Sequence, residues 1–231
     1  MTPRIDLNCD LGEGAGHDAE LMPLITSANI ACGSHAGDAA TMRATVALAR
    51  RHGVAIGAHP GYEDREYFGR REMVLARGDV QALVERQVRL LREMTAVVHV
   101  KPHGALYNLA ARDAEVAREV AAAVRAVDAG LVLVALRGSE LVRAGRACGL
   151  RVAEEVFADR TYRADGSLSP RCEPGAVITD EVEAVAQALR LVRGGADTIC
   201  LHGDGVHAVA FAQRLNAELR NTGIAIRPLG A

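Results

Sequence analysis

Two imidazoles and an ammonium alternate with valines in the stretch VVHVKPHGALYN, residues 97–108. Val98 and Val100 share one parity, and the basic residues share the other, namely His99, Lys101 and His103. A β-strand sends alternate side chains to opposite faces, so the stretch predicts a strand with one apolar and one titratable face. Because imidazole and ammonium groups transfer protons and pair with anions, the titratable face is a candidate for acid–base chemistry.

Polar strand ends recur along the chain. Five further strand-like segments carry polar or small residues on one parity and run toward an imidazole or a carboxylate: Asp10, Glu13, His35, Asp38, His59, Asp159, His202 and Asp204. Each residue alone has a structural explanation, because a histidine can be satisfied in a core and Asp38 can be a helix N-cap. The convergence of so many ends indicates one cluster of acid–base groups, at which a divalent metal could also bind.

Lys101 is expected inside the fold, where an unpaired ammonium would be costly. Its structural explanation is a salt bridge to Asp6 or to Asp10, both of which lie on the polar parity of the first segment.

Short strand-like segments alternate with longer amphipathic ones, which is typical of βα units around a parallel sheet. The strand candidates are Ile5–Leu11, Asn29–Gly33, Val54–Ala58, Val97–Lys101, Leu131–Leu136, Val152–Phe157 and Thr198–Leu201. We expect Asp79 and Asp113 to cap two helices and Thr179 to open a third. An open sheet covered on both faces would need apolar runs, whereas a barrel can hold a polar interior. We therefore predict a single-domain, TIM-like (β/α) barrel of seven strands over residues 1–231, with Ile224–Arg227 as an irregular eighth.

Two connections are long enough to be functional. The first, Pro60–Gly78, holds three aromatic and four arginine residues, and we predict that it forms a lid or a surface that docks a partner. The second, Ala158–Gly175, is also rich in arginine.

Composition argues against several protein classes. A net charge of −2 without a basic run predicts no nucleic-acid partner. Neither a secretory signal nor an apolar run long enough to span a bilayer is visible, and the five cysteines show no CxxC spacing, so we predict a cytoplasmic protein with reduced thiols and no membrane partner. The sequence also lacks a GxxxxGK[ST] phosphate loop and a GxSxG elbow. The residues alone predict a hydrolase-like barrel for a small anionic compound.

Seven segments resemble, in order and spacing, the LamB/YcsF family: DLNCDLGEG, NIACGSHAGD, GAHPGY, FGRR, VKPHGALYN, EVFADRTY and HGD. They cover essentially the whole chain. The family usually reads CGFHAGDP where this chain has Ser34 and Ala39, and HGDTP or HGDNP where it has Gly205 and Val206. Neither departure changes an ionisable position.

The resemblance implies ATP-dependent hydrolytic opening of 5-oxo-L-proline to L-glutamate, performed with two partner subunits, B and C, of a 5-oxoprolinase. Since the chain shows no phosphate loop, the nucleotide chemistry, with Mg²⁺ on the ATP, would be completed with the partners. Two alternatives stay open: a stand-alone metal-dependent amidohydrolase or deacetylase-like barrel, and a non-catalytic subunit. The family's barrel is also similar to metal-dependent sugar deacetylases, which makes Asp10, His35 and His59 candidate metal ligands. A homo-oligomer is possible.

Within this interpretation the barrel supplies a base for water, a proton donor to the ring nitrogen and cations for the substrate carboxylate. We predict these catalytic residues: Asp10, Glu13, His35, His59, Lys101, His103 and Asp204. We predict these substrate-binding residues: Asn8, Arg70, Tyr107, Arg160, Arg171 and His202.

Overall fold

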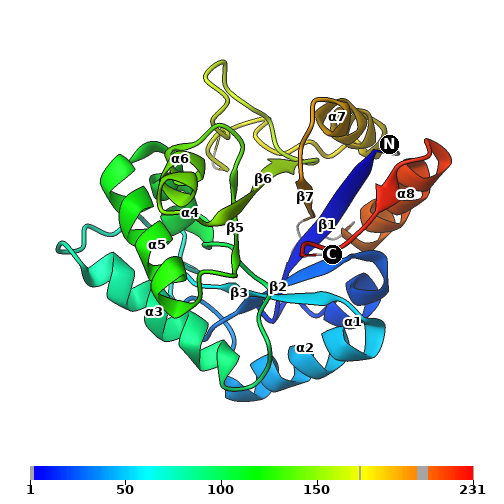
Figure 1. Ribbon diagram of the computed structural model, residues 1–231. Coiled ribbons are helices and arrows are strands. Elements are labelled where there is room, and N and C mark those ends of the chain that lie inside the picture. Colours follow the sequence, from blue (N-terminus) through cyan, green and yellow to red (C-terminus); the bar gives the residue numbers. More distant parts are fainter. Residues whose placement is uncertain (1–2, 172, 202–207, 231) are drawn as a thin grey trace.

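Parallel strands pair side by side into a closed ring in the computed structural model of the chain (Figure 1). The strands are β1 (Arg4–Leu11), β2 (Ser27–Ala31), β3 (Ala55–His59), β4 (His99–Val100), β5 (Val132–Leu136), β6 (Arg151–Phe157) and β7 (Thr198–Leu201). Neighbours follow chain order, and β1 closes the ring by pairing with both β2 and β7. The structure describes residues 3–171, 173–201 and 208–230. The predicted seven-stranded (β/α) barrel is confirmed.

The alternation that predicts a barrel is visible along β1. Its odd-numbered residues, Ile5, Leu7, Cys9 and Leu11, belong to the hydrophobic core between the strands and the helices. On the other parity, the Asn8 amide donates across the barrel to Glu155 Oε1 at 2.9 Å. On β1, the side that faces the barrel interior is therefore polar and hydrogen-bonded, and the side that faces the helices is apolar.

Helices surround the strands (Figure 1). They are α1 (Asp18–Leu21), the 3₁₀ helix η1 (Met22–Leu24), α2 (Ala39–His52), α3 (Asp79–Arg92), α4 (Gly104–Arg112), α5 (Ala114–Val127), α6 (Glu140–Ala147), α7 (Glu181–Arg193) and α8 (Ala208–Asn221). Asp113 caps α5 as predicted. Gly78, not Asp79, is the N-cap of α3, and Asp180 caps α7, one residue after the predicted Thr179. Within the described ranges, every helix is too short or too polar to cross a membrane.

The segment that carries the histidines changes structure within a few residues. The predicted strand Val97–Lys101 contracts to His99–Val100, and Pro102 follows, which cannot donate to a sheet ladder. His103 is the N-cap residue of α4. Lys101 and His103 therefore lie just past the strand, where the barrel opens.

The predicted eighth strand exists as β8 (Ala225–Ile226). It pairs with the start of β1, where Pro3 O accepts from Ala225 N and Ile5 O accepts from Arg227 N, both at 2.9 Å. Farther along the same edge, Leu7 O accepts from Thr26 N at 2.9 Å. Thus β8 and β2 pair with the same edge of β1, β8 at its first residues and β2 at its last ones, and β8 covers the N-terminal end of the ring.

Both long connections are anchored at the C-terminal end of the ring. In the first, Pro60 O accepts from His103 N at 2.8 Å, and Tyr62 is fully buried. The second folds back on itself through the antiparallel bridges Arg160–Val177 and Tyr162–Leu168. The first connection is thus partly core rather than a separate lid.

Candidate active site

A cavity of about 750 Å³ opens where the strands reach their C-terminal residues. Its floor includes the titratable residues Asp10, Glu13, His59, Lys101 and His103. Its walls include four of the predicted substrate-binding residues, which come from α4 and the two long connections: Arg70, Tyr107, Arg160 and Arg171. The structure therefore brings most of the predicted site residues to one space.

The Lys101 ammonium lies inside the barrel mouth among four polar atoms. They are Glu155 Oε1 at 2.8 Å, Cys200 Sγ at 3.0 Å, Asp10 Oδ1 at 3.1 Å and Asn8 Oδ1 at 3.2 Å. Burial by itself would lower the pKa of Lys101, but the negative charges around it, led by Asp10, raise that pKa well above its usual value. Lys101 therefore stays cationic and balances two carboxylates, and its predicted pairing with Asp10 is confirmed.

Asp6, the alternative partner, binds other groups. Its carboxylate accepts from three hydroxyls at 2.5 to 2.7 Å, those of Thr198, Ser27 and Thr26. Asp6 precedes Asp10 by four strand residues, roughly 13 Å along β1, so it lies near the opposite end of the barrel. Burial raises the pKa of Asp6 to about 6.

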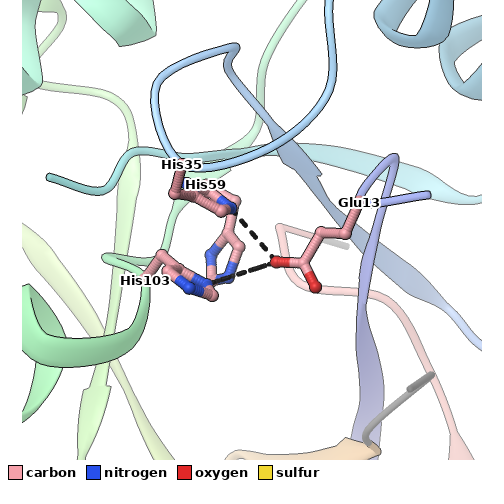
Figure 2. A group of neighbouring side chains, drawn as sticks. All are labelled: Glu13, His35, His59 and His103. Atoms are coloured by element: carbon pink, nitrogen blue, oxygen red, sulfur yellow. Dashed lines mark hydrogen bonds and ion pairs between the residues drawn. The ribbon is translucent and has the colours of Figure 1, made fainter. Parts of the chain in front are cut away.

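Three imidazoles converge on one oxygen of Glu13 (Figure 2). Measured to Glu13 Oε1, the distances are 3.1 Å from His35 Nε2, 3.2 Å from His103 Nδ1 and 3.7 Å from His59 Nε2. His59 Nε2 and His103 Nδ1 are 3.0 Å apart. The His35 and His103 rings stack in parallel, with centroids 3.7 Å apart. We call Glu13, His35, His59 and His103 the histidine cluster.

Main-chain carbonyls determine the tautomers of two of these rings. Lys101 O is 2.7 Å from His59 Nδ1, and Phe68 O is 2.8 Å from His103 Nε2. A carbonyl can only accept a hydrogen bond, so each of these nitrogens carries a proton and donates it. In the neutral rings, the opposite nitrogens then present lone pairs toward Glu13.

Glycines let the first long connection pack on the histidine cluster. A Cβ on Gly61 would lie 2.7 Å from His35 Nδ1, and one on Gly69 would lie 2.8 Å from His35 Cβ. Contacts this short do not occur for real side chains, so both positions require glycine. In the motifs GAHPGY and FGRR, the glycines thus leave room for the imidazoles.

Burial and mutual contacts shift the protonation of the cluster. Burial would raise the pKa of Glu13, but the imidazoles of His103 and His35 outweigh it and hold the pKa well below its usual range. Burial lowers the pKa of His35 to about 4. Glu13 is therefore an anion surrounded by rings, and His35 is neutral near pH 7.

Sequence reasoning missed Glu155 and Cys200 as site residues. Tyr107, which lines the cavity, donates to Glu155 Oε2 at 2.6 Å, and the other oxygen of that carboxylate binds Lys101. The signal was present, because both missed residues lie on the inward parity of their strands; what the pattern could not show is that Lys101 reaches both.

The cavity wall carries more arginine than predicted. Besides Arg70, Arg160 and Arg171, it includes Arg112, Arg137, Arg143 and Arg163. Burial, together with the nearby charge of Arg171, lowers the pKa of Arg160. A wall with adjacent like charges suits a ligand that carries a carboxylate or a phosphate.

Several predicted residues lie elsewhere. Asn8 is fully buried beneath the cavity, where it accepts from Lys101 and donates to Thr198, so it supports the floor instead of contacting substrate. His35 lies behind the stacked ring of His103 and does not line the cavity. Asp38 is the N-cap of α2, and Asp159 is absent from the cavity lining. His202 and Asp204 lie outside the described residues.

Comparisons with known proteins agree with these features. The model of the LamB/YcsF family matches residues 5–231. A protein of Geobacillus kaustophilus, named as the A subunit of 5-oxoprolinase, is 54% identical in an alignment that covers 96% of each chain. The crystal structure of a lactam utilization protein from Thermus thermophilus superimposes with a TM-score of 0.91 at 43% identity, covering 98% of this chain and 100% of that one.

A more distant likeness concerns the fold alone. The catalytic domain of a peptidoglycan N-acetylglucosamine deacetylase from Eubacterium rectale gives a TM-score of 0.55 at 12% identity, covering 99% of this chain and 89% of that one. The full-length family match and the close relatives decide the assignment. The chain belongs to the LamB/YcsF family.

Proposed function

We propose that this chain is the A component of an ATP-dependent 5-oxoprolinase, which adds water to 5-oxo-L-proline and releases L-glutamate. The observation that carries the proposal is the cavity, in which an arginine-rich wall faces a floor of one ammonium, two accessible carboxylates and two imidazoles. The names of the close relatives support the same reaction. The B and C subunits complete the enzyme, and ATP with its Mg²⁺ is used by the complete complex.

The substrate is a small lactam with one carboxylate, and the cavity offers a place for each part. We assign the substrate carboxylate to the arginine wall, with Arg160 and Arg171 as the residues that bind it. The lactam group then points toward the floor, where Asp10 and His103 face it from different elements. Tyr107 lies on the wall between the two regions and is held by Glu155.

Ring opening adds the oxygen of water to the lactam carbonyl carbon and breaks its bond to the ring nitrogen. Transfer of the terminal phosphoryl group of ATP to the lactam oxygen activates the carbonyl carbon and releases ADP. After the first water adds there, cleavage of the bond to nitrogen leaves an acyl phosphate, and the second water hydrolyses it to glutamate and phosphate. Asp10 is the base in this scheme, because it lines the cavity and because Lys101 and Asn29 each donate to Asp10 Oδ1 and so orient the carboxylate. It accepts the proton from water and returns it to the ring nitrogen. The sequence holds no GxxxxGK[ST] loop, so the phosphoryl transfer is assigned to the complex with B and C.

A coupled assay tests the proposal. Glutamate and ADP are expected in equal amounts when the chain is mixed with B, C, ATP and 5-oxoproline, and neither is expected when one component or ATP is left out. Steady hydrolysis of lactams or acetamides by the chain alone, without ATP, would instead establish the stand-alone amidohydrolase.

A further inference from the structure

Two lone pairs and a carboxylate meet at the floor of the cavity. Since His59 Nδ1 donates to Lys101 O and His103 Nε2 donates to Phe68 O, the other nitrogens of these rings face each other across 3.0 Å. Glu13 Oε1 completes the triangle at 3.2 and 3.7 Å. Asp10 Oδ2 also lies 3.4 Å from His59 Nε2. These electron-rich atoms repel one another unless a cation, either a proton or a metal ion, lies among them.

We propose that Glu13, His59 and His103 bind a divalent transition-metal ion of the Zn²⁺ class at the cavity floor. Imidazole nitrogen with a single carboxylate oxygen is a donor set for zinc, cobalt or nickel, whereas Mg²⁺ and Ca²⁺ prefer oxygen ligands. The site differs from the set expected from the sequence, because His35 and Asp10 are replaced as ligands by Glu13 and His103.

The spacing of the donor atoms fits a tetrahedral ion. Metal–ligand bonds of roughly 2.0–2.1 Å place neighbouring donors in a tetrahedron roughly 3.3 Å apart. The three measured separations, 3.0, 3.2 and 3.7 Å, bracket that value. All three residues line the cavity, so the fourth position faces the space assigned to substrate and water. Three protein ligands with one open position are typical of catalytic zinc sites.

The surroundings hold the ligands as metal sites do. Ligating histidines generally donate their other N–H to a carbonyl or carboxylate, and both His59 and His103 donate to main-chain carbonyls. His35, whose stacked ring cannot share a metal in plane with His103, lies 3.1 Å from Glu13 Oε1 through Nε2. We assign it to orienting the carboxylate.

Backbone strain lies at the same place. Phe68, whose carbonyl binds His103, adopts a φ of 56°, in the left-handed region that costs a non-glycine residue roughly 1–2 kcal/mol. Strain of this kind persists where the surrounding structure requires it, and it is enriched at functional sites. The strained carbonyl fixes the ring whose other nitrogen faces the proposed ion.

The test is binding of Co²⁺ and Zn²⁺ to the purified, chelator-treated chain without substrate, so it does not rest on the proposed function. One Co²⁺ per chain is expected, with visible absorption bands of a site rich in nitrogen. Glu13→Gln and His103→Gln should each raise the dissociation constant by about 100-fold or more. His35→Phe, which keeps the stacked ring but loses the bond to Glu13, should raise it by about 10-fold to 100-fold. His17→Ala, which removes an exposed imidazole 3.2 Å from Glu20, is the matched control and should leave it unchanged.

Circular dichroism checks that each variant is folded. If a variant does not fold, X-ray absorption of the Zn²⁺-loaded wild-type chain decides instead, and two imidazole ligands are expected. Absence of stoichiometric binding, equal affinity in Glu13→Gln and wild type, or a zinc spectrum without imidazole would each overturn the proposal and leave a shared proton as the cation of the cluster.

Discussion

Lys101 combines two functions that the sequence cannot separate: it neutralises charge inside the barrel, and it lines the cavity. Its ammonium contacts Asp10 on the accessible side and Glu155 on the fully buried side. The parity of the strand predicts that Lys101 points inward. It does not predict how deep the ammonium lies, and depth decides that Asp10 and not Asp6 is its partner.

Removing this ammonium should damage the fold. Lys101→Met leaves two carboxylates facing each other without a cation, which typically costs about 3–5 kcal/mol. Urea unfolding should show this loss, and Lys101→Met combined with Glu155→Gln should recover part of it, because one of the two charges is gone. Wild-type stability in the single variant would show that the charges are balanced in another way.

His99 should make the protein sensitive to acid. It is fully buried within reach of Asn29 Oδ1, at 2.8 Å, and burial, with the charge of Lys101, lowers its pKa to about 3. The unfolded chain binds a proton near the ordinary value of about 6.5, so this contribution to stability is complete above that pH and is lost as the pH falls toward 3.

The comparison is urea unfolding at pH 7.0 and pH 5.5 for wild type and His99→Gln, whose amide can still donate to Asn29. Between pH 7.0 and pH 5.5, the free energy of unfolding of the wild type should fall by about 1 kcal/mol more than that of the variant. One titrating group changes this free energy by at most about 1.4 kcal/mol per pH unit. Equal losses would mean that His99 takes up a proton in the native barrel.

The connection Pro60–Gly78 illustrates what an element adds to its residues. The sequence predicts its functional importance from length and composition, and the structure shows how it acts: two glycines and one carbonyl pack on the imidazoles. Replacing Phe68 in this segment should therefore affect stability, contrary to a lid or docking loop that is independent of the core. Such contacts join residues far apart in sequence, so no local pattern contains them.

Two glycines of this element separate backbone strain from steric displacement. Gly69 and Gly78 both have positive φ values, of 63° and 89°, but only a Cβ on Gly69 would meet the cluster, whereas one on Gly78 would meet nothing within 4 Å. Each alanine variant should lose about 1–2 kcal/mol from the backbone conformation. Gly69→Ala should also reduce turnover of the complete enzyme by about 10-fold or more, because His35 and His103 must move. Equal turnover in the two variants would show that the packing of this connection on the imidazoles does not affect catalysis.

Across the whole molecule, the two ends of the barrel differ in what they hold: one end holds the cavity, and the other holds the pairing of β8 with β1. The strand candidates and their order follow from alternation, because a period of two is readable in sequence and parallel strands in βα units pair in few ways. The cavity wall does not follow in the same way, since its arginines come from irregular connections. The end covered by β8 holds hydrogen bonds that close the ring, far from the cavity residues.

Disturbing that closed end should change stability without changing catalysis. Arg227→Pro removes the N–H that bonds to the buried Ile5 carbonyl, while Arg227→Ala keeps it. The free energy of unfolding of the proline variant should be about 1–3 kcal/mol lower than that of the alanine variant. Turnover per folded molecule should be the same in both. A fall in turnover at a temperature where the proline variant is fully folded would show that the two ends are coupled.

The location of the thiols gives the barrel a built-in reporter. Among the four cysteines that the structure describes, Cys9, Cys32 and Cys200 are buried, and only Cys148 is partly accessible. Burial raises the pKa of the three buried thiols, so alkylating reagents meet neither an exposed sulfur nor a thiolate there. Their modification must wait until strands separate, and the rate of labelling at each position, followed by mass spectrometry, will measure how often β1, the β2 end and β7 open in the native protein.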